Sequence, residues 1–118
     1  MRTDIIIGSR GSQLALIQSE SVASKLRELS PYLNVSVTKI QTKGDHNRHT
    51  RLDHMAEVGI FVKELEEALF DGNIDLAVHS LKDMPTQIPT ELCLIAVTER
   101  LEPRDVLVSR ARTLAEIP

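Results

Sequence analysis

The chain has 118 residues, of which 42% are hydrophobic and 26% charged, and its net charge is −3. These values are typical of one soluble globular domain. The negative charge argues against general nucleic-acid binding, which needs a basic face. No apolar run approaches the ~20 residues of a membrane span, and the single cysteine, Cys93, permits no internal disulfide. We therefore expect a cytoplasmic protein that binds neither nucleic acid nor membranes.

The first forty residues alternate between strand and helix signals. Residues 4–9 (DIIIGS) form a short β-branched apolar run, which predicts a buried strand. Residues 12–29 predict a helix with Ser12 as its N-cap. Residues 35–42 alternate imperfectly between apolar and polar, which favours a second strand. The predicted helix has an apolar face that consists of Ala15, Val22, Leu26 and Leu29.

The middle of the chain is polar and then returns to helix. Residues 43–57 show little periodicity and predict a long mobile loop. Its histidines match no closed zinc pattern, so we predict no metal site; they are His46, His49 and His54. Residues 59–72 predict a helix that Gly72 can cap. The apolar face of that helix consists of Phe61, Leu65, Ala68 and Leu69.

Further strands follow in the last third of the chain. Residues 75–80 (DLAVHS) and 92–99 (LCLIAVTE) each predict a buried strand, with Cys93 as a small core residue, and residues 105–109 give a weaker signal. Strands that alternate with helices indicate an α/β fold with a mostly parallel sheet flanked by helices. Parallel strands are buried on both faces, which explains the unbroken apolar runs.

Two polar clusters stand at the ends of predicted strands. Residues 9–12 (SRGS) follow the first strand, and residues 79–83 (HSLKD) complete and follow a later one. Ligands of parallel sheets bind beyond the carboxyl ends of the strands, so we expect the clusters to converge. An anion could bind there, although a helix cap and a solvated turn explain the same residues. His79 is interpreted as a hydrogen-bonded structural residue.

Three segments carry a specific resemblance: GSRGSQLALIQ, GIFVKELEEALFDGNIDLAVHSLKDMP and ERLEPRDVLVS. In order and spacing they are similar to the porphobilinogen deaminase (hydroxymethylbilane synthase) family. The resemblance implies a first domain like that of periplasmic binding proteins, with an incomplete sheet. It also implies that residues 1–100 belong to this N-terminal domain, and that residues 101–118 form a hinge and the first strand of a second domain.

The resemblance further implies an enzyme of heme (tetrapyrrole) biosynthesis. Such enzymes join four porphobilinogen molecules into hydroxymethylbilane and release ammonia, on a dipyrromethane cofactor linked to a cysteine that this chain lacks. Asp83 matches the catalytic aspartate, which stabilises positive charge on the pyrroles. The matching substrate residues are Arg10, Ser12 and Gln18. The matching cofactor contacts are Ser80, Lys82 and Phe61.

Two expectations concern what the chain does by itself. Family members are more than twice as long, so we expect no deaminase activity from these 118 residues alone. The alternative is a module of the same α/β architecture that binds small carboxylates without catalysis. We also expect a homo-oligomer formed through an unpaired sheet edge, because Val106 and Val108 would otherwise expose apolar surface.

Overall fold

A computed structural model describes residues 2–41, 61–106, 108 and 115. The chain divides into two compact units, Met1–Gln87 and Ile88–Pro118, which are described separately. Among the described residues, the first unit contains β1 (Asp4–Ser9), α1 (Gln13–Leu29), β2 (Asn34–Lys39), α3 (Lys63–Phe70), β3 (Leu76–Ala77) and the short 3-10 helix η2 (Leu81–Asp83).

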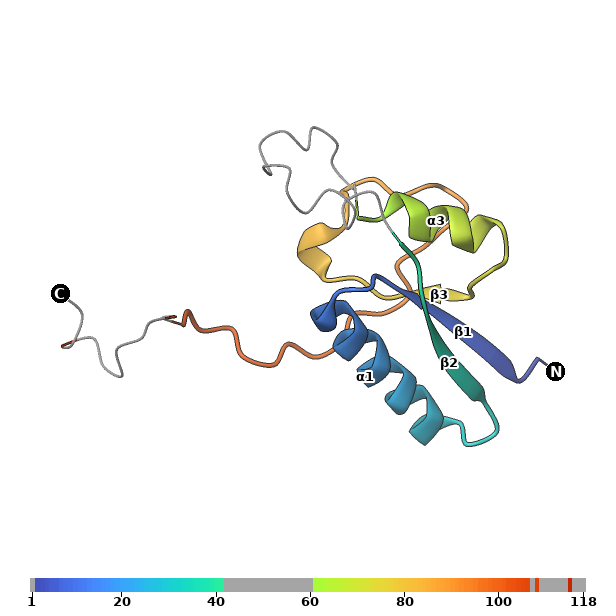
Figure 1. The fold of residues 1–118 in the computed structure, drawn as a ribbon, viewed down its shortest axis with the longest axis horizontal. Helices are drawn as coiled ribbons and strands as arrows, with labels where there is room; N and C mark the ends of the chain where they lie inside the picture. Colours follow the sequence, from blue (N-terminus) through green and yellow to red (C-terminus); the bar gives the residue numbers. More distant parts are fainter. Residues whose placement is uncertain (1, 42–60, 107, 109–114, 116–118) are drawn as a thin grey trace. The chain divides into compact units, whose positions relative to one another are not determined.

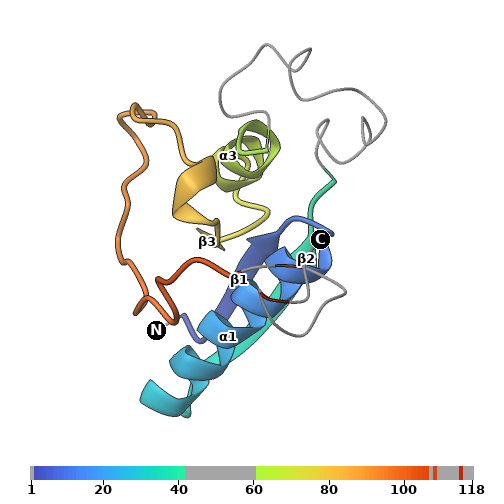
Figure 2. The ribbon, with the colours of Figure 1, turned by 90° about the vertical axis from the view of Figure 1, so that its left-hand side faces the viewer.

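A parallel three-stranded sheet of order β2-β1-β3 forms the centre of the first unit (Figure 1). Asp4 lies opposite Asn34 on β2, and Ile7 lies opposite Leu76 on β3. Helix α1 covers one face of the sheet and α3 the other, as Figures 1 and 2 show. The predicted α/β fold, with an incomplete and mostly parallel sheet between helices, is confirmed.

Successive residues of β1 point to opposite faces of the sheet and supply two separate cores. Ile7 is fully buried on the α1 side, where it packs with Ala23 and Val35. Ile6 packs on the α3 side against a core centred on Leu65. Each helix is therefore held by its own apolar stripe, and β1 joins the two layers.

Helix α1 begins as predicted, and its predicted apolar face is confirmed at Val22 and Leu26, which pack against the core on this side of the sheet. The Ser12 hydroxyl accepts a hydrogen bond from the Ala15 N–H at 3.3 Å, which confirms Ser12 as the N-cap. Ser19 and Ala23 are the buried residues of the helix. Leu29 is 73% exposed, so its placement on the core face is wrong. Six residues beyond Ala23, it lies about 120° around the helix from that residue.

Helix α3 lies within the predicted range, and its predicted apolar face is confirmed at Leu65, Ala68 and Leu69. Leu65 and Ala68 are buried, and Leu69 packs against them. Gly72 follows the helix with φ of +71°, where its N–H donates to the Leu69 carbonyl at 3.1 Å. The predicted glycine cap is therefore confirmed. Phe61 precedes the helix instead of lying within it.

Strand β3 is shorter than the predicted 75–80 segment, but its hydrogen bonds to β1 extend beyond it. The Asp75 N–H donates to the Ile6 carbonyl at 2.8 Å, and the Val78 N–H reaches the Gly8 carbonyl at 3.4 Å. The Asp75 carboxylate also accepts from the Ile6 N–H at 2.8 Å and pairs with Arg2. This double contact fixes the register that directs the following residues to the sheet edge.

Residues 88–106 of the second unit contain no helix or strand. The predicted strand at 92–99 is therefore wrong, and residues 105, 106 and 108 of the weaker 105–109 signal are not in a strand. Cys93 is exposed, so its assignment to the core is wrong as well. A strand needs a hydrogen-bonded neighbour, and no described residue provides one here. The exposed apolar residues are Leu94, Ile95, Val97, Leu101, Val106 and Val108.

The predicted loop at 43–57, with its three histidines, lies outside the described residues. Across the parts of the chain that are described, no group of three or more His, Cys, Asp or Glu side chains is arranged to hold a metal ion. No helix in those same parts is both long and apolar enough to cross a bilayer.

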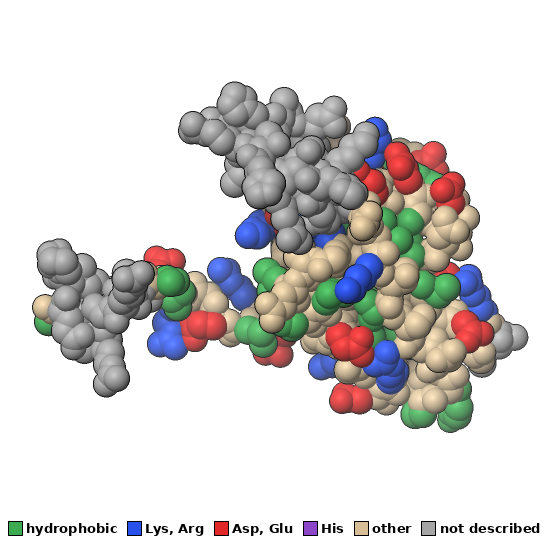
Figure 3. Space-filling model, in the orientation of Figure 1, with side chains coloured by type: hydrophobic (Ala, Val, Ile, Leu, Met, Phe, Trp, Pro, Cys, Tyr) green, Lys and Arg blue, Asp and Glu red, His purple; other side chains and the backbone are tan. Residues whose placement is uncertain are grey.

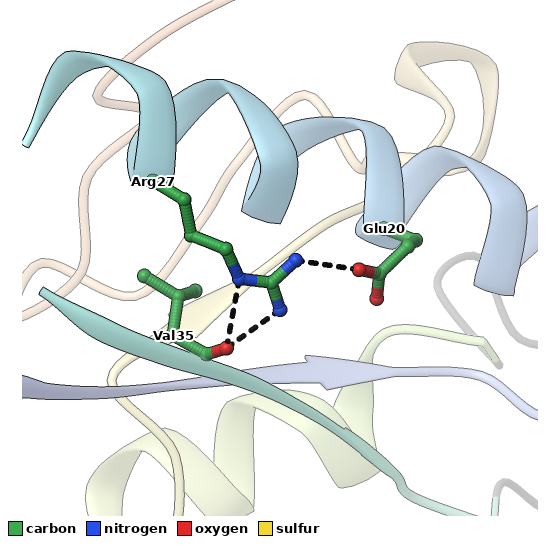
Figure 4. A network of polar contacts seen from close by, with 3 residues as sticks. All are labelled: Glu20, Arg27 and Val35. Carbon is green, nitrogen blue, oxygen red and sulfur yellow. Dashed lines mark hydrogen bonds and ion pairs between the residues drawn. The ribbon is translucent and has the colours of Figure 1, made fainter. Parts of the chain in front are cut away.

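Arg27 joins α1 to the outer edge of the sheet (Figure 4). Its Nε and Nη2 atoms lie 3.2 and 2.6 Å from the Val35 carbonyl oxygen, and Nη1 lies 2.7 Å from Glu20 Oε1. The Asn34 N–H faces β1, donating to Thr3, so the neighbouring Val35 carbonyl faces away from it. Arg27 thus covers an edge carbonyl of β2, which disfavours pairing with another chain at that edge.

We expect Arg27→Ala to lower the free energy of unfolding by about 1–2 kcal/mol, because it exposes this carbonyl and removes a charge-assisted donor. Glu20→Ala removes only the ion pair between half-exposed side chains and should cost within about 0.5 kcal/mol. Urea unfolding of both variants measures the difference. Equal losses would mean that the contact with Val35 contributes nothing.

Candidate functional site

The two polar clusters meet at the carboxyl edge of the sheet, as expected. Strands β1 and β3 are parallel neighbours, so residues that follow Ser9 and residues that follow Ala77 leave the sheet on the same side. The Ser80 hydroxyl donates to Gln18 Oε1 at 3.1 Å, across 62 positions of sequence. This hydrogen bond links η2 to α1 and defines one site at that edge.

Hydrogen bonds of its own serines stabilise the turn between β1 and α1. Ser9 is fully buried, and its hydroxyl donates to the Arg10 carbonyl at 2.9 Å. The Ser12 hydroxyl caps α1, and the Ser12 carbonyl accepts from the Leu16 N–H. A hydroxyl that accepts through its oxygen still carries a proton to donate. The cap therefore does not exclude the expected contact between Ser12 and an anion.

Arg10 and Phe61 are stacked. The guanidinium carbon of Arg10 lies 3.8 Å from the centroid of the Phe61 ring, and both residues are half-buried. Phe61 comes from the segment that leads into α3, whereas Arg10 comes from the β1–α1 turn. Segments far apart in sequence thus place an aromatic ring and a cation at the same edge of the sheet.

The segment after β3 turns into η2. The Asp83 N–H donates to the Ser80 carbonyl at 3.0 Å, and the Met84 N–H donates to the Leu81 carbonyl at 3.1 Å. Met84 is extended (φ −76°, ψ 134°), as expected of a residue before a proline. Within this turn Lys82 is exposed and Asp83 is half-buried. The site therefore offers an exposed cation and a more enclosed carboxylate.

His79 lies among the charged residues of the site, whereas the sequence analysis interpreted it as a hydrogen-bonded structural residue. Burial lowers the pKa of His79 below its usual value of 6.5, and this effect outweighs the opposing charge of Asp83; Arg10 lowers the pKa further. The imidazole is thus close enough to both charged groups to sense them. Its place in the second polar cluster was evident from sequence, whereas its proximity to Arg10 required the folded chain.

The stability of the first unit should depend on pH through His79. A pKa that is lower in the folded chain means that the unfolded chain binds more protons just below pH 6.5. Stability should fall as the pH decreases through that value and then level off below the folded pKa. We expect His79→Gln to flatten this step, which urea midpoints at about pH 5.5 and about pH 7.5 would reveal. An unchanged step would assign the dependence to another group.

Charge is distributed unevenly around the first unit. Acidic side chains gather over α3 in Figure 3, where Glu67 and Asp71 are exposed. At the carboxyl edge of the sheet, Arg10 and Lys82 supply positive charge beside Asp83. An anionic ligand is therefore repelled by the outer face of α3 and attracted to the site edge.

Comparison with known families identifies the chain. The family model described as "Porphobilinogen deaminase, dipyromethane cofactor binding domain" matches residues 5–118. The chain belongs to the porphobilinogen deaminase family. It is 48% identical over 113 residues to the porphobilinogen deaminase of Syntrophomonas wolfei, and 49% identical over 119 residues to that of Alkaliphilus metalliredigens.

The match covers nearly all of this chain and a minor part of each relative. It includes 95% of the chain and 37% of the Syntrophomonas wolfei protein, and 100% of the chain and 37% of the Alkaliphilus metalliredigens protein. For Geobacter sulfurreducens the identity is 46%, over 95% of the chain and 35% of the relative. The chain thus spans little more than a third of the length of these deaminases.

The residues at the site fit the cofactor named in the family description. Such a group carries pyrrole N–H donors and, like porphobilinogen, carboxylate arms. The half-buried Asp83 can accept from the N–H groups, and Lys82, Arg10 and the Ser80 hydroxyl can donate to the carboxylates. The single cysteine, Cys93, is exposed and belongs to the second unit.

Proposed function

We propose that the first unit supplies the pyrrole-binding part of a porphobilinogen deaminase, which works in tetrapyrrole biosynthesis. The observation that carries the proposal is the Ser80–Gln18 hydrogen bond, because it links the second polar cluster to α1, the helix that begins directly after the first cluster. Family membership supports porphobilinogen as the substrate class. The overall reaction would join four porphobilinogen molecules into hydroxymethylbilane and release one ammonia at each step.

In this proposal the β1–α1 turn binds the carboxylate arms of the substrate. Arg10 offers a planar set of N–H donors that suits a carboxylate in a bidentate arrangement. Ser12 stands at the N-terminus of α1, where backbone N–H groups and the helix dipole favour an anion. Gln18, held by Ser80, adds an amide that can donate from its nitrogen.

Asp83 is the proposed catalytic residue. Positive charge develops on the pyrrole nitrogens when the aminomethyl nitrogen departs, and a preplaced carboxylate stabilises it. Partial burial strengthens this effect, since water competes less for the charges. The hydrogen bond from the Asp83 N–H to the Ser80 carbonyl keeps Asp83 in one turn with Ser80, whose hydroxyl contacts α1.

The cofactor would be held by the same edge of the sheet. Ser80 and Lys82 lie in or beside η2 and can donate to its carboxylates, and Phe61 offers aromatic surface. When bound, the dipyrromethane group supplies the anchor on which the pyrrole chain grows.

We expect the 118-residue chain to bind porphobilinogen without converting it, since it spans only about a third of its relatives' length. Calorimetric titration should detect binding that Asp83→Asn weakens about tenfold, the loss of one charge-assisted hydrogen bond. Incubation with porphobilinogen should yield no bilane, and intact mass should show no adduct on Cys93. Formation of bilane or of such an adduct would contradict the expected inactivity.

Two controls separate this proposal from the carboxylate-binding alternative. Asp71→Asn makes the same chemical change at an exposed position after α3 and should leave affinity unchanged. Succinate carries two carboxylates and no pyrrole, and it should bind more weakly than porphobilinogen. Equal affinity for the two ligands, together with no effect of Asp83→Asn, would favour the non-catalytic module.

A further inference from the structure

The stack between Arg10 and Phe61 constrains the plane of the guanidinium. At 3.8 Å from the ring centroid, the guanidinium carbon is in van der Waals contact with the ring. Both side chains are half-buried, so neighbouring atoms limit their movement. A guanidinium standing on edge at this distance would push an N–H group into the ring, so the guanidinium plane lies close to parallel with the ring face.

This arrangement determines how a carboxylate can approach Arg10. The N–H bonds of a guanidinium lie in its own plane, so a stacked guanidinium directs them along the ring surface instead of into it. A bidentate carboxylate must meet them at the edge of that plane. A guanidinium that rotated freely would lose entropy on binding, and the stack reduces that loss in advance.

The stack also limits what else Phe61 can contact. One face of its ring is covered by Arg10, so a bound pyrrole has at most the opposite face or the ring edge. The expected role of Phe61, aromatic contact with the cofactor, describes only part of what the residue does here. The contact between Phe61 and Arg10 therefore requires a separate explanation.

We propose that Phe61 is a positioning residue that orients Arg10 for the carboxylate arm of a bound pyrrole. This inference rests on the proposed function, because it concerns the same site and the same ligand. It predicts that the contribution of the ring to affinity is made through the guanidinium of Arg10.

A double-mutant cycle with porphobilinogen tests the coupling in the full chain. Phe61→Leu keeps an apolar side chain without a ring and should weaken binding about fivefold, the typical cost of ordering one long side chain on binding. In the Arg10→Ala background, the same change should have no further effect. Phe61→Tyr keeps the ring and should retain most of the affinity lost in Phe61→Leu.

The second aromatic residue of this helix region provides a matched control. Phe70 is 52% exposed at the end of α3, and Phe70→Leu should not alter affinity. Without any ligand, the Arg10 Hε proton should show an upfield ring-current shift in NMR spectra. That shift should persist in Phe61→Tyr and disappear in Phe61→Leu.

The outcomes distinguish this inference from the function on which it rests. If the unaltered chain binds porphobilinogen and Phe61→Leu has no effect, or has the same effect without Arg10, only the positioning role is overturned. If the Arg10 Hε shift is the same in Phe61→Leu, the stack itself is overturned. If the unaltered chain does not bind porphobilinogen, the proposed function fails, and the carboxylate role of the stack fails with it.

Discussion

Replacing Arg10 with alanine is expected to weaken porphobilinogen binding about 30-fold or more. The guanidinium can donate two parallel hydrogen bonds to one carboxylate, and their loss together corresponds to at least ~2 kcal/mol. Arg10 is half-buried, so solvent compensates only partly for the missing charge. Isothermal titration calorimetry at low ionic strength measures the change directly.

A charge-matched control makes this result specific. Lys25→Ala removes one positive charge from an exposed position of α1 and changes the net charge equally. Its affinity should stay within about twofold, because exposed charges are screened by solvent and salt. Similar losses in both variants would mean that affinity depends on overall charge, and that Arg10 does not contact the ligand.

Replacing Gly8 with valine should have the largest effect on folding. A Cβ at this position would lie 2.3 Å from Ile74 Cδ1 and 3.3 Å from Leu65 Cδ2. Ile74 is 2% exposed and Leu65 fully buried, so neither has space to move aside. We expect a loss of about 3 kcal/mol, from overpacking of the core between β1 and α3. Thermal unfolding followed by circular dichroism should show a midpoint lower by ~10 °C or more.

Two further variants identify the cause as steric. A Cβ added at Gly11 would meet no atom within 4 Å, so Gly11→Ala should cost little stability. Gly8→Ala adds only the Cβ and should also lower stability, because that atom would meet Ile74 Cδ1. Ile74→Val removes Cδ1 and should recover part of this loss. Independent, additive effects of Gly8→Ala and Ile74→Val would contradict direct contact.

The parts of the fold that were predictable from sequence depend on local signals. The Ser12 cap and the Gly72 turn each depend on a few neighbouring residues, and both are present. The convergence of the two clusters required one further rule, that parallel strands end at the same edge. The Ser80–Gln18 hydrogen bond follows from that rule, although no pattern in the sequence indicates that particular pair.

The failed predictions concern residues whose structure depends on distant partners. Residues 92–99 have the composition of a strand, but composition cannot provide the neighbouring strand that they need. Leu29 was placed by spacing alone, whereas the buried stripe of α1 is centred on the small residues Ser19 and Ala23. The stacking of Phe61 on Arg10 joins segments about fifty residues apart, and only the folded chain reveals it.

The most direct test of the proposed site is a titration of the isotope-labelled chain with porphobilinogen, followed through its backbone amide NMR signals. We predict that the shifts concentrate in residues 9–18, which comprise the first cluster and the start of α1, and in the second cluster, residues 79–83. Asp83→Asn and Arg10→Ala should each reduce these shifts at equal ligand concentration. Shifts confined to the exposed apolar residues of the second unit, or no shifts at all, would contradict the proposal that this edge binds the pyrrole.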